Sequence, residues 1–411
     1  MPLRPLRVSI FPYIPDLAGD KLAGLKQFIA NEFKKKYGQQ VEVESTADPY
    51  NLKKLKSNHL TDDKDAYDAM EVDTILLGEL AKTGLLQTLE NHFEVGTDVY
   101  TSSAVHSVRY SPHLKSHLYG VPTLQCASFL MELADVDHTP KTPLLKDWKS
   151  FKELKEVLDK AEAESDHRLL LCGDFRGSWG LPMFYLEAYV DKHGKHSAYE
   201  GIDAPVDDPE LIEELKEFTD FGELPSGKNP DIDGEFHAGH EKLITEVVDS
   251  EHILMYAYSE NMGEALQKAA TKNKHKRTLR IVSPPLDDSN NLLTYTDAVV
   301  VNKSKFADPQ RAALIKMFVE FYTSLAFRTS FAFGRDLPDS VTYKRYVLPA
   351  CRAFFAQKDV EDDEYYKQFH DALLHHSIPA PNHDIYGKRK ALQKELKKAL
   401  GIEQKAHTQL I

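Results

Sequence analysis

The chain has 411 residues, of which 42% are hydrophobic and 28% are charged, and its net charge at pH 7 is −13. A chain of this length can bury a large core and form two lobes. The acidic balance argues against a nucleic-acid ligand, which requires a basic surface, and favours a cationic or neutral ligand.

Cysteine content and hydropathy exclude further classes of protein. The three cysteines, Cys126, Cys172 and Cys351, are too few for a disulfide framework and form no C-x-x-C zinc motif. No run approaches the roughly 18 apolar residues of a membrane helix, and the N-terminus lacks the apolar region of a signal peptide. We therefore expect no membrane contact, and a location that is cytoplasmic as the sequence stands and secreted if a signal has been removed. We also expect no metal or cofactor, and a monomer, although no sequence pattern determines the oligomeric state.

The first part of the chain alternates between strand and helix patterns. Strands are predicted at 6–11, 40–45 and 70–77, helices at 21–37, 51–56 and from 78 on, and a solvated charged loop at 62–65. This order indicates an α/β layer with a largely parallel sheet. Asp73 interrupts the third strand. It is either a carboxylate at a strand end or a ligand group at the carboxyl end of the sheet, where open α/β sheets bind ligands.

A single thiol lies in the stretch 119–131, which is predicted to be strand. Cys126 has two interpretations. It is either a small buried hydrophobe, as most unpaired cysteines are, or a nucleophile presented to a cleft, which requires a nearby base and access to solvent. The pattern of residues around it leaves both open.

The second part of the chain continues the alternation. Helices are predicted at 147–163, 181–193, 209–218, 241–248, 260–271 and 309–327, strands at 168–172, 253–258, 279–283 and 296–301, and mainly helix from 347 on. The glycine-rich turn at 173–180 matches no phosphate-binding motif, so it is either a plain helix entry or a ligand-lining turn. His370, His375 and His376 do not share a helix face, which argues against a metal site.

A second carboxylate begins one of these helices. Ser259 is predicted to cap the helix that follows the strand at 253–258. Glu260 then lies in the first turn, where the helix dipole favours a negative charge. This structural role is sufficient to explain a glutamate at that position, and a catalytic role is the alternative.

Six stretches together resemble one known family. They are Phe-Pro-Tyr-Ile-Pro-Asp at 11–16, Glu-Val-Asp-Thr-Ile-Leu-Leu at 71–77, Tyr-Gly-Val-Pro-Thr-Leu-Gln-Cys-Ala-Ser-Phe-Leu at 119–130, Gly-Ser-Trp-Gly-Leu-Pro-Met-Phe-Tyr-Leu-Glu-Ala-Tyr at 177–189, Tyr-Ser-Glu at 258–260 and Tyr-Thr-Asp-Ala-Val at 295–299. In this order they resemble thiaminase I (thiamine pyridinylase). Each stretch is weak evidence alone, and the set is fairly specific.

The resemblance implies a two-lobed α/β fold of the type II periplasmic-binding-protein kind, with a ligand cleft between the lobes. The implied domains are lobe 1 from 1–128 and 296–345, lobe 2 from 129–295, and a C-terminal helical segment at 346–411 that packs on the lobes. In such a fold, the residues expected to converge on one cleft are Cys126, Asp73, Asp297 and Glu260.

The resemblance also implies roles for these residues. Cys126 would add to the electron-poor C6 of the thiamine pyrimidine after Glu260 removes the thiol proton. The thiazole then leaves, and an amine, pyridine or thiol co-substrate replaces it. Asp73 and Asp297 would hydrogen-bond the aminopyrimidine. Candidates for aromatic walls around this flat cation are Tyr13, Tyr50, Trp179 and Tyr258.

Two other functions fit the same residues. A solute-binding protein of this fold would capture thiamine or a related small cation without converting it, because fold alone does not determine function. A related transferase would act on another activated heterocycle. The pair of Cys126 and Glu260 distinguishes an enzyme from a binding protein, since a binding protein needs no thiol in its cleft.

Overall fold

The computed structural model describes residues 4–46, 48–113, 115–135, 152–156, 170–173, 175–194, 198–221, 252–273, 277–283, 291–339, 341 and 343–402. The chain forms two compact units. Unit 1 comprises Met1–Cys126, Thr294–Asp362 and Pro379–Tyr386, and unit 2 comprises Ala127–Leu293, Asp363–Ile378 and Gly387–Ile411. The chain thus leaves unit 1 for the first time directly after Cys126. The residues from 346 on, which we predicted as one C-terminal helical segment, are shared between the two units.

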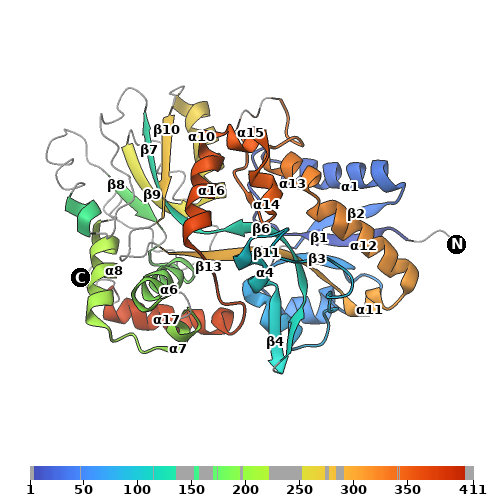
Figure 1. Ribbon diagram of the computed structural model, residues 1–411, viewed down its shortest axis with the longest axis horizontal. Helices are drawn as coiled ribbons and strands as arrows, with labels where there is room; N and C mark the ends of the chain where they lie inside the picture. Colours follow the sequence, from blue (N-terminus) through green and yellow to red (C-terminus); the bar gives the residue numbers. More distant parts are fainter. Residues whose placement is uncertain are drawn as a thin grey trace, which may run out of the picture. The chain divides into compact units, whose positions relative to one another are not determined.

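Unit 1 is built on a seven-stranded sheet (Figure 1). Its order is β12 (Leu348–Pro349), β6 (Gly120–Cys126), β11 (Leu292–Val301), β3 (Ala69–Asp73), β1 (Leu6–Ile10) and β2 (Val41–Ser45), and β13 (Ser377–Pro379) pairs with β11. β1 is parallel to β2 and β3, whereas β11 is antiparallel to β3 and β6. The prediction of a largely parallel sheet, which was made from the first three strands, holds for β1, β2 and β3 but not for the sheet as a whole. The sheet is mixed because β11 enters between β3 and β6 in the opposite direction, and the apolar pattern of a buried strand does not encode its direction.

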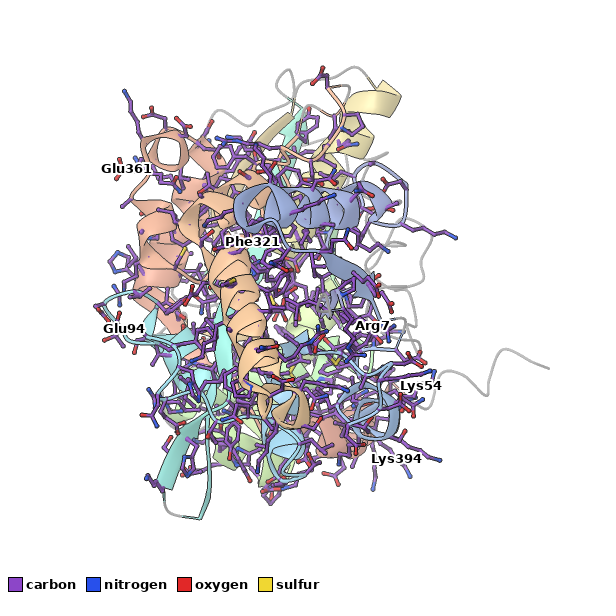
Figure 2. The ribbon with its side chains drawn as sticks, turned by 90° about the vertical axis from the view of Figure 1, so that its right-hand side faces the viewer. Arg7, Lys54, Glu94, Phe321, Glu361 and Lys394 are labelled. Atoms are coloured by element: carbon purple, nitrogen blue, oxygen red, sulfur yellow. The ribbon has the colours of Figure 1, made fainter. Side chains whose placement is uncertain are left out.

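Helices α1 and α12 pack against each other beside this sheet. The helices of unit 1 are α1 (Ala23–Tyr37), α2 (Leu52–Lys54), α3 (Leu77–Ala81), α4 (Ser102–Ser107), α11 (Lys303–Phe306), α12 (Pro309–Thr323), α13 (Leu325–Ala332), α14 (Arg352–Phe355) and α15 (Lys358–Glu361), with a π-helix at Leu55–His59, a 3-10 helix at Thr74–Leu76, and a hairpin of β4 (Arg109–His113) and β5 (Lys115–Leu118). Leu25, Ile29 and Phe33 form the buried face of α1 at helical spacing. Figure 2 shows Phe321 where α12 passes α1, and its ring centroid lies 5.6 Å from that of Phe33.

Three predicted elements end earlier than expected. The strand predicted at 70–77 stops at Asp73, whose side chain accepts a hydrogen bond from the backbone N–H of Ile75 and so caps a 3-10 helix. The helix predicted at 309–327 is interrupted at Ser324, whose hydroxyl caps α13. The strand predicted at 119–131 is two strands, β6 and β7 (Ser128–Asp135), which are separated by Ala127 and belong to different sheets. In the first two cases a capping side chain competes with continuation of the element.

Unit 2 is built on a four-stranded sheet of order β10 (Arg277–Val282), β7, β9 (His252–Tyr258) and β8 (Leu170–Gly173). β7 is antiparallel to both neighbours, and β8 is parallel to β9. The helices of this unit include α6 (Gly180–His193), α7 (Ala198–Asp203), α8 (Pro209–Phe221), α10 (Ser259–Asn273), α16 (Glu364–His376) and α17 (Ile385–Ala399) (Figure 1). The helices predicted at 147–163 and 241–248 lie outside the described residues, except that 152–156 are helical. None of the described helices has the length and apolar character needed to cross a membrane.

A buried ion pair joins β3 of unit 1 to α13. Glu71 accepts hydrogen bonds from the backbone N–H of Phe11 (3.0 Å) and from the hydroxyl of Tyr322 (2.7 Å). Arg328 Nη2 lies 3.6 Å from Glu71 Oε1, and both side chains are buried. The guanidinium also lies 4.1 Å from the centroid of the Tyr322 ring. One carboxylate therefore links β1, β3, α12 and α13, and each buried charge depends on the other for compensation.

Removing the Glu71 charge is expected to destabilise unit 1 strongly. Glu71→Gln keeps the shape of the side chain but leaves the Arg328 charge uncompensated, and breaking a buried pair in this way costs about 3–5 kcal/mol of unfolding free energy. As a control, Glu42→Gln removes an exposed carboxylate that lies 3.5 Å from Arg7 and should cost less than about 1 kcal/mol. Urea denaturation followed by circular dichroism measures both variants. Equal losses would contradict the structural role of the buried pair.

Candidate functional site

Four predicted site residues lie at one edge of the sheet of unit 1. Tyr13 follows β1, Tyr50 follows β2, Asp73 ends β3 and Cys126 ends β6. β6 is antiparallel to β11, which is antiparallel to β3, so β6 runs in the same direction as β1, β2 and β3. All four residues therefore belong to the carboxyl ends of strands, which is where α/β sheets bind ligands.

The strand register places the two predicted carboxylates and the thiol on one face. Asp297 of β11 is directly opposite Asp73 of β3 and Leu124 of β6. Two residues earlier on β11, Tyr295 is opposite Cys126. Residues directly opposite each other on neighbouring strands point to the same face, as do residues two apart on one strand. Asp73, Asp297 and Cys126 therefore share one face of the sheet.

Tyr50 holds the carboxyl group of Asp73. Tyr50 Oη donates to Asp73 Oδ2 at 3.0 Å, and the backbone N–H of Ile75 donates to Oδ1 at 3.0 Å. Burial raises the pKa of Asp73 to about 6, although both hydrogen bonds oppose this shift. Burial also raises the pKa of Tyr50 well above its usual range, and the charges of Asp73 and Asp297 add to the rise. Tyr50 is therefore a neutral hydrogen-bond donor, and Asp73 is mostly ionised at neutral pH.

Aromatic rings stack beside these carboxylates. The rings of Tyr13 and Tyr50 are 6.0 Å apart and inclined by 20°, and those of Tyr50 and Tyr386 are 6.1 Å apart and inclined by 13°. Phe11 packs edge-on against both Tyr13 and Tyr50. Flat aromatic surfaces next to carboxylates favour a planar cation. Tyr386 is not among the predicted aromatic residues, because no motif marks it and only the tertiary fold brings it to Tyr50.

The thiols of the protein differ in access. Cys126 is partly exposed, whereas Cys351 is buried with 7% of its surface accessible. Burial raises the pKa of the Cys351 thiol, which lowers its thiolate fraction and its reactivity. The side chain of Cys172 lies outside the described residues. Of the two described thiols, Cys126 is the one that a small molecule in solution can reach.

Glu260 of unit 2 lies in the first turn of α10, directly after β9, as predicted. The helix begins at Ser259 itself, so the prediction that Ser259 is the capping residue before the helix is wrong by one position. Ser259 Oγ donates to Glu260 Oε2 at 3.2 Å. Burial raises the pKa of Glu260 to about 7, against the hydrogen bonds from Ser259 and from its own backbone N–H. A carboxyl group with a pKa near 7 can both accept and release a proton at neutral pH.

The other two predicted aromatic residues also belong to unit 2. Tyr258 ends β9 opposite Ser128 of β7. Trp179 directly precedes α6 and is 6% exposed, and the guanidinium carbon of Arg389 lies 4.2 Å from its ring centroid. This cation–π contact covers one face of the indole. Glu260 and Tyr258 therefore lie at one strand-to-helix junction of unit 2.

The side chains at the carboxyl ends of the unit 1 strands determine which ligands this part of the protein can bind and which reactions it can support. Among the residues that the structure describes, no group of three or more His, Cys, Asp or Glu side chains is arranged to hold a metal ion. A carboxylate pair and stacked rings can bind a planar cation that carries N–H donors. An accessible thiol on the same face can attack an electron-poor carbon of such a ligand.

Neither a protein-family model nor a curated protein matches the sequence, but solved structures match its fold. Thiaminase I from Bacillus thiaminolyticus is 20% identical, with a TM-score of 0.68 over 97% of this chain and 100% of its own. Clostridium botulinum thiaminase I in complex with thiamin is 15% identical, with a TM-score of 0.68 over 96% and 100%. An ABC transporter solute-binding protein from Thermotoga lettingae bound with α-D-tagatose is 14% identical, with a TM-score of 0.67 over 97% and 95%.

These likenesses establish the fold class. The chain has the two-lobed α/β fold of periplasmic binding proteins that thiaminase I structures and solute-binding proteins share, so the predicted fold class is confirmed. Thiaminase I structures and a solute-binding protein bound with a sugar appear side by side among the neighbours. The fold therefore does not choose between them, and function must be argued from the site.

The two described thiols should differ sharply in reactivity. Because Cys126 is partly exposed and Cys351 is buried with a raised pKa, iodoacetamide at pH 7.5 should alkylate Cys126 at least about tenfold faster. Peptide mass spectrometry resolves each cysteine, and urea-unfolded protein serves as the control in which access no longer differs. Comparable rates in the folded protein would show that Cys126 is not presented to solvent.

Glu260 should make the protein less stable as the pH rises. Its pKa increases from 4.5 to about 7 on folding, so the folded state binds this proton more tightly and stability falls between these two pH values. Glu260→Gln removes the titrating group. The stability of the variant relative to the parent should therefore grow by about 2–3 kcal/mol from pH 4 to pH 8, as measured by urea denaturation.

A second variant checks the cause of this trend. Ser259→Ala removes a hydrogen bond that lowers the Glu260 pKa, so the decline in stability should extend to higher pH. A stability difference between Glu260→Gln and the parent that does not change with pH would refute the shifted pKa.

Proposed function

We propose that the protein is a thiamine pyridinylase, a transferase that exchanges the thiazole of thiamine for a small nucleophile. The observation that carries this proposal is the partly exposed thiol of Cys126 on the sheet face that also bears Asp73 and Asp297. The sequence stretches that resemble thiaminase I contain all three residues. The presence of thiaminase I structures among the fold neighbours supports the same choice.

In the proposed first half-reaction, Cys126 becomes covalently attached to the substrate. Glu260 takes the proton of the thiol, and the electron pair of the thiolate forms a bond to C6 of the pyrimidine ring. The bond between the methylene carbon and the thiazolium nitrogen then breaks. Its electron pair leaves with the thiazole, which departs as a neutral molecule because the pair cancels its positive charge. This is covalent catalysis by a base-activated thiol.

In the second half-reaction, the co-substrate takes the place of the thiazole. An amine, pyridine or thiol attacks the methylene carbon, and the sulfur–C6 bond breaks with its electron pair returning to Cys126. Glu260 gives the proton back to the thiolate. An amine or thiol co-substrate then releases its own surplus proton to solvent, whereas a pyridine product keeps the positive charge. A pKa of about 7 suits Glu260 to both proton transfers.

Substrate binding is assigned mainly to the carboxylates. Asp73 and Asp297 accept hydrogen bonds from the amino group and ring nitrogen of the pyrimidine, as charge-assisted bonds. Tyr50 fixes the orientation of Asp73 through its hydroxyl. Tyr13, Tyr50, Trp179 and Tyr258 are the proposed aromatic contacts. The proposal requires residues of both units to act on the same substrate molecule.

The second candidate function is capture of thiamine or a related small cation without conversion. The observation that favours it is the TM-score of a sugar-bound solute-binding protein, 0.67, which is close to the 0.68 of the thiaminase I structures. Such a protein would use the carboxylates and the rings in the same way. It would have no use for Cys126 as a nucleophile, and a test of turnover therefore separates the two functions.

The test is thiamine turnover by the purified protein with and without pyridine or aniline. The parent protein should release the thiazole and form the pyrimidinylmethyl adduct of the added nucleophile, both identified by mass spectrometry. Cys126→Ser should lose at least about 10³-fold in rate, because serine is a much weaker nucleophile at neutral pH. Cys351→Ala is the matched control and should keep its activity. Binding of thiamine without conversion under every condition would rule out the transferase and favour the binding protein.

A further inference from the structure

The strand that ends at Cys126 contains one extra residue. Along the pairing of β6 with β11, Gly120, Val121 and Pro122 match residues 300, 299 and 298 in regular order. The next pair is Leu124 with Asp297, so Thr123 has no partner of its own on β11. This is a β-bulge, in which two residues of one strand oppose one residue of the other.

The bulge determines the face on which the thiol lies. Beyond it, Gln125 is opposite Thr296 and Cys126 is opposite Tyr295. If the regular order before the bulge continued, Gln125 would be opposite Tyr295 and Cys126 would be opposite Thr294. A shift of one residue moves every following side chain to the other face. Without the bulge, the Gln125 side chain would therefore lie on the same face of the sheet as Asp297, and the Cys126 side chain would lie on the opposite face.

Thr123 itself secures the bulge. Pro122 has no backbone N–H to give to the ladder, and proline inside a sheet is largely restricted to such irregular positions. Thr123 Oγ1 donates to the carbonyl oxygen of Asp297 at 2.9 Å, and the carbonyl of Thr123 accepts from the backbone N–H of Ala350 at 3.0 Å. The Thr123 side chain is buried. Its hydroxyl thus joins the extra residue to the strand that carries the opposing carboxylate.

The other face of β6 supports the same register. Gln125 accepts a hydrogen bond from the hydroxyl of Thr101 at 2.6 Å and donates to the hydroxyl of Ser103 at 2.8 Å. Thr101 is also the residue that caps α4. A thiol in the position of the Gln125 side chain would be a poor substitute in both bonds, because sulfur is a weak donor and acceptor. The bulged register thus places Gln125 in a polar surrounding and the thiol on the face of the carboxylates.

We propose that Thr123 is a positioning residue whose hydroxyl selects the bulged register and so aims the Cys126 thiol at the face of Asp73 and Asp297. The role as a positioning residue for catalysis rests on the proposed function, because it assumes that Cys126 is the nucleophile. The effect on register does not rest on it. The two statements can therefore be tested separately.

The register is measured by thiol labelling at position 125. The test protein carries Gln125→Cys together with Cys126→Ser. With the bulge present, the thiol at position 125 takes the place of the buried Gln125 side chain. It is expected to react only when the bulge is lost and the side chain of residue 125 turns to the face of Asp297. Thr123→Val keeps the side-chain shape but removes the hydroxyl, and it should raise the iodoacetamide labelling rate at position 125 by at least fivefold. Thr123→Ser keeps the hydroxyl and should restore the slow rate.

Thr296→Val is the matched control for this experiment. Thr296 is also buried, lies next to Asp297 and is opposite position 125, but its hydroxyl has no hydrogen-bond partner among the described residues. Its replacement should leave the labelling rate unchanged. Equal rates in Thr123→Val and Thr296→Val would overturn the proposal. Circular dichroism verifies that each variant folds. If Thr123→Val does not fold, Thr123→Ala replaces it and should also label faster at position 125.

The second test is thiamine turnover. For this test, the Thr123 variants are made in the protein that keeps Gln125 and Cys126. Thr123→Val should lower kcat at least threefold with little change in KM, and Thr123→Ser should retain most of the activity. If the parent protein does not turn over thiamine, the proposed function fails while the labelling arm still decides the role of Thr123 in the register. If labelling responds but kcat does not, Thr123 sets the register without positioning the nucleophile, and the catalytic part of the proposal is refuted.

Discussion

The position of β11 between β3 and β6 is the constraint on which the candidate site depends. Its register puts Asp297 opposite Asp73, and this register is anchored at the far end of the strand. There the backbone N–H of Asn302 donates to the carbonyl of Asp68 at 3.1 Å. The carboxylate of Asp68 in turn forms two hydrogen bonds with Arg311, at 2.7 and 2.5 Å. Because a slip of one residue would turn every side chain of β11 to the other face, this anchor decides which residues face the thiol.

Three buried carboxylates in β3 and directly before it, Asp68, Glu71 and Asp73, differ in their partners. Asp68 and Glu71 are each paired with a buried arginine, Arg311 and Arg328 respectively. Asp73 forms no ion pair with any described residue and is held by hydrogen bonds alone. Burial without a cationic partner raises its pKa and therefore costs stability at neutral pH. A cationic ligand would recover that cost, which is why the proposed function assigns substrate binding to Asp73 and not to Asp68 or Glu71.

The sequence predicted the elements better than the connections between them. Helical spacing and apolar runs located most strands and helices. The pattern placed Asp73 inside a strand over 70–77, whereas the strand ends at Asp73 because its side chain caps the 3-10 helix that follows. Glu260 was predicted in the first turn of a helix, where the structure places it. The local pattern does not mark the break at Ala127, because no glycine or proline lies there and the chain continues directly into another sheet. Only the resemblance to thiaminase I implied a lobe boundary in this region, between residues 128 and 129. The bulge at Thr123 and the contact of Tyr386 with Tyr50 depend on pairing with distant segments, which a local pattern does not contain.

The choice between an enzyme and a binding protein can be argued from features that cost stability. A binding protein would benefit from the carboxylate pair and the stacked rings, which hold a flat cation whether or not it reacts. It would gain nothing from a bulge that interrupts the β6–β11 ladder and turns Cys126 to the face of Asp297. Nor does binding alone require a half-buried Glu260 whose pKa is raised to about 7, since this shift lowers the stability of the folded state progressively from about pH 4.5 to pH 7. A nucleophile and a proton-transfer group need these two arrangements, and perturbed groups of this kind are characteristic of catalytic sites. The costs therefore favour the transferase.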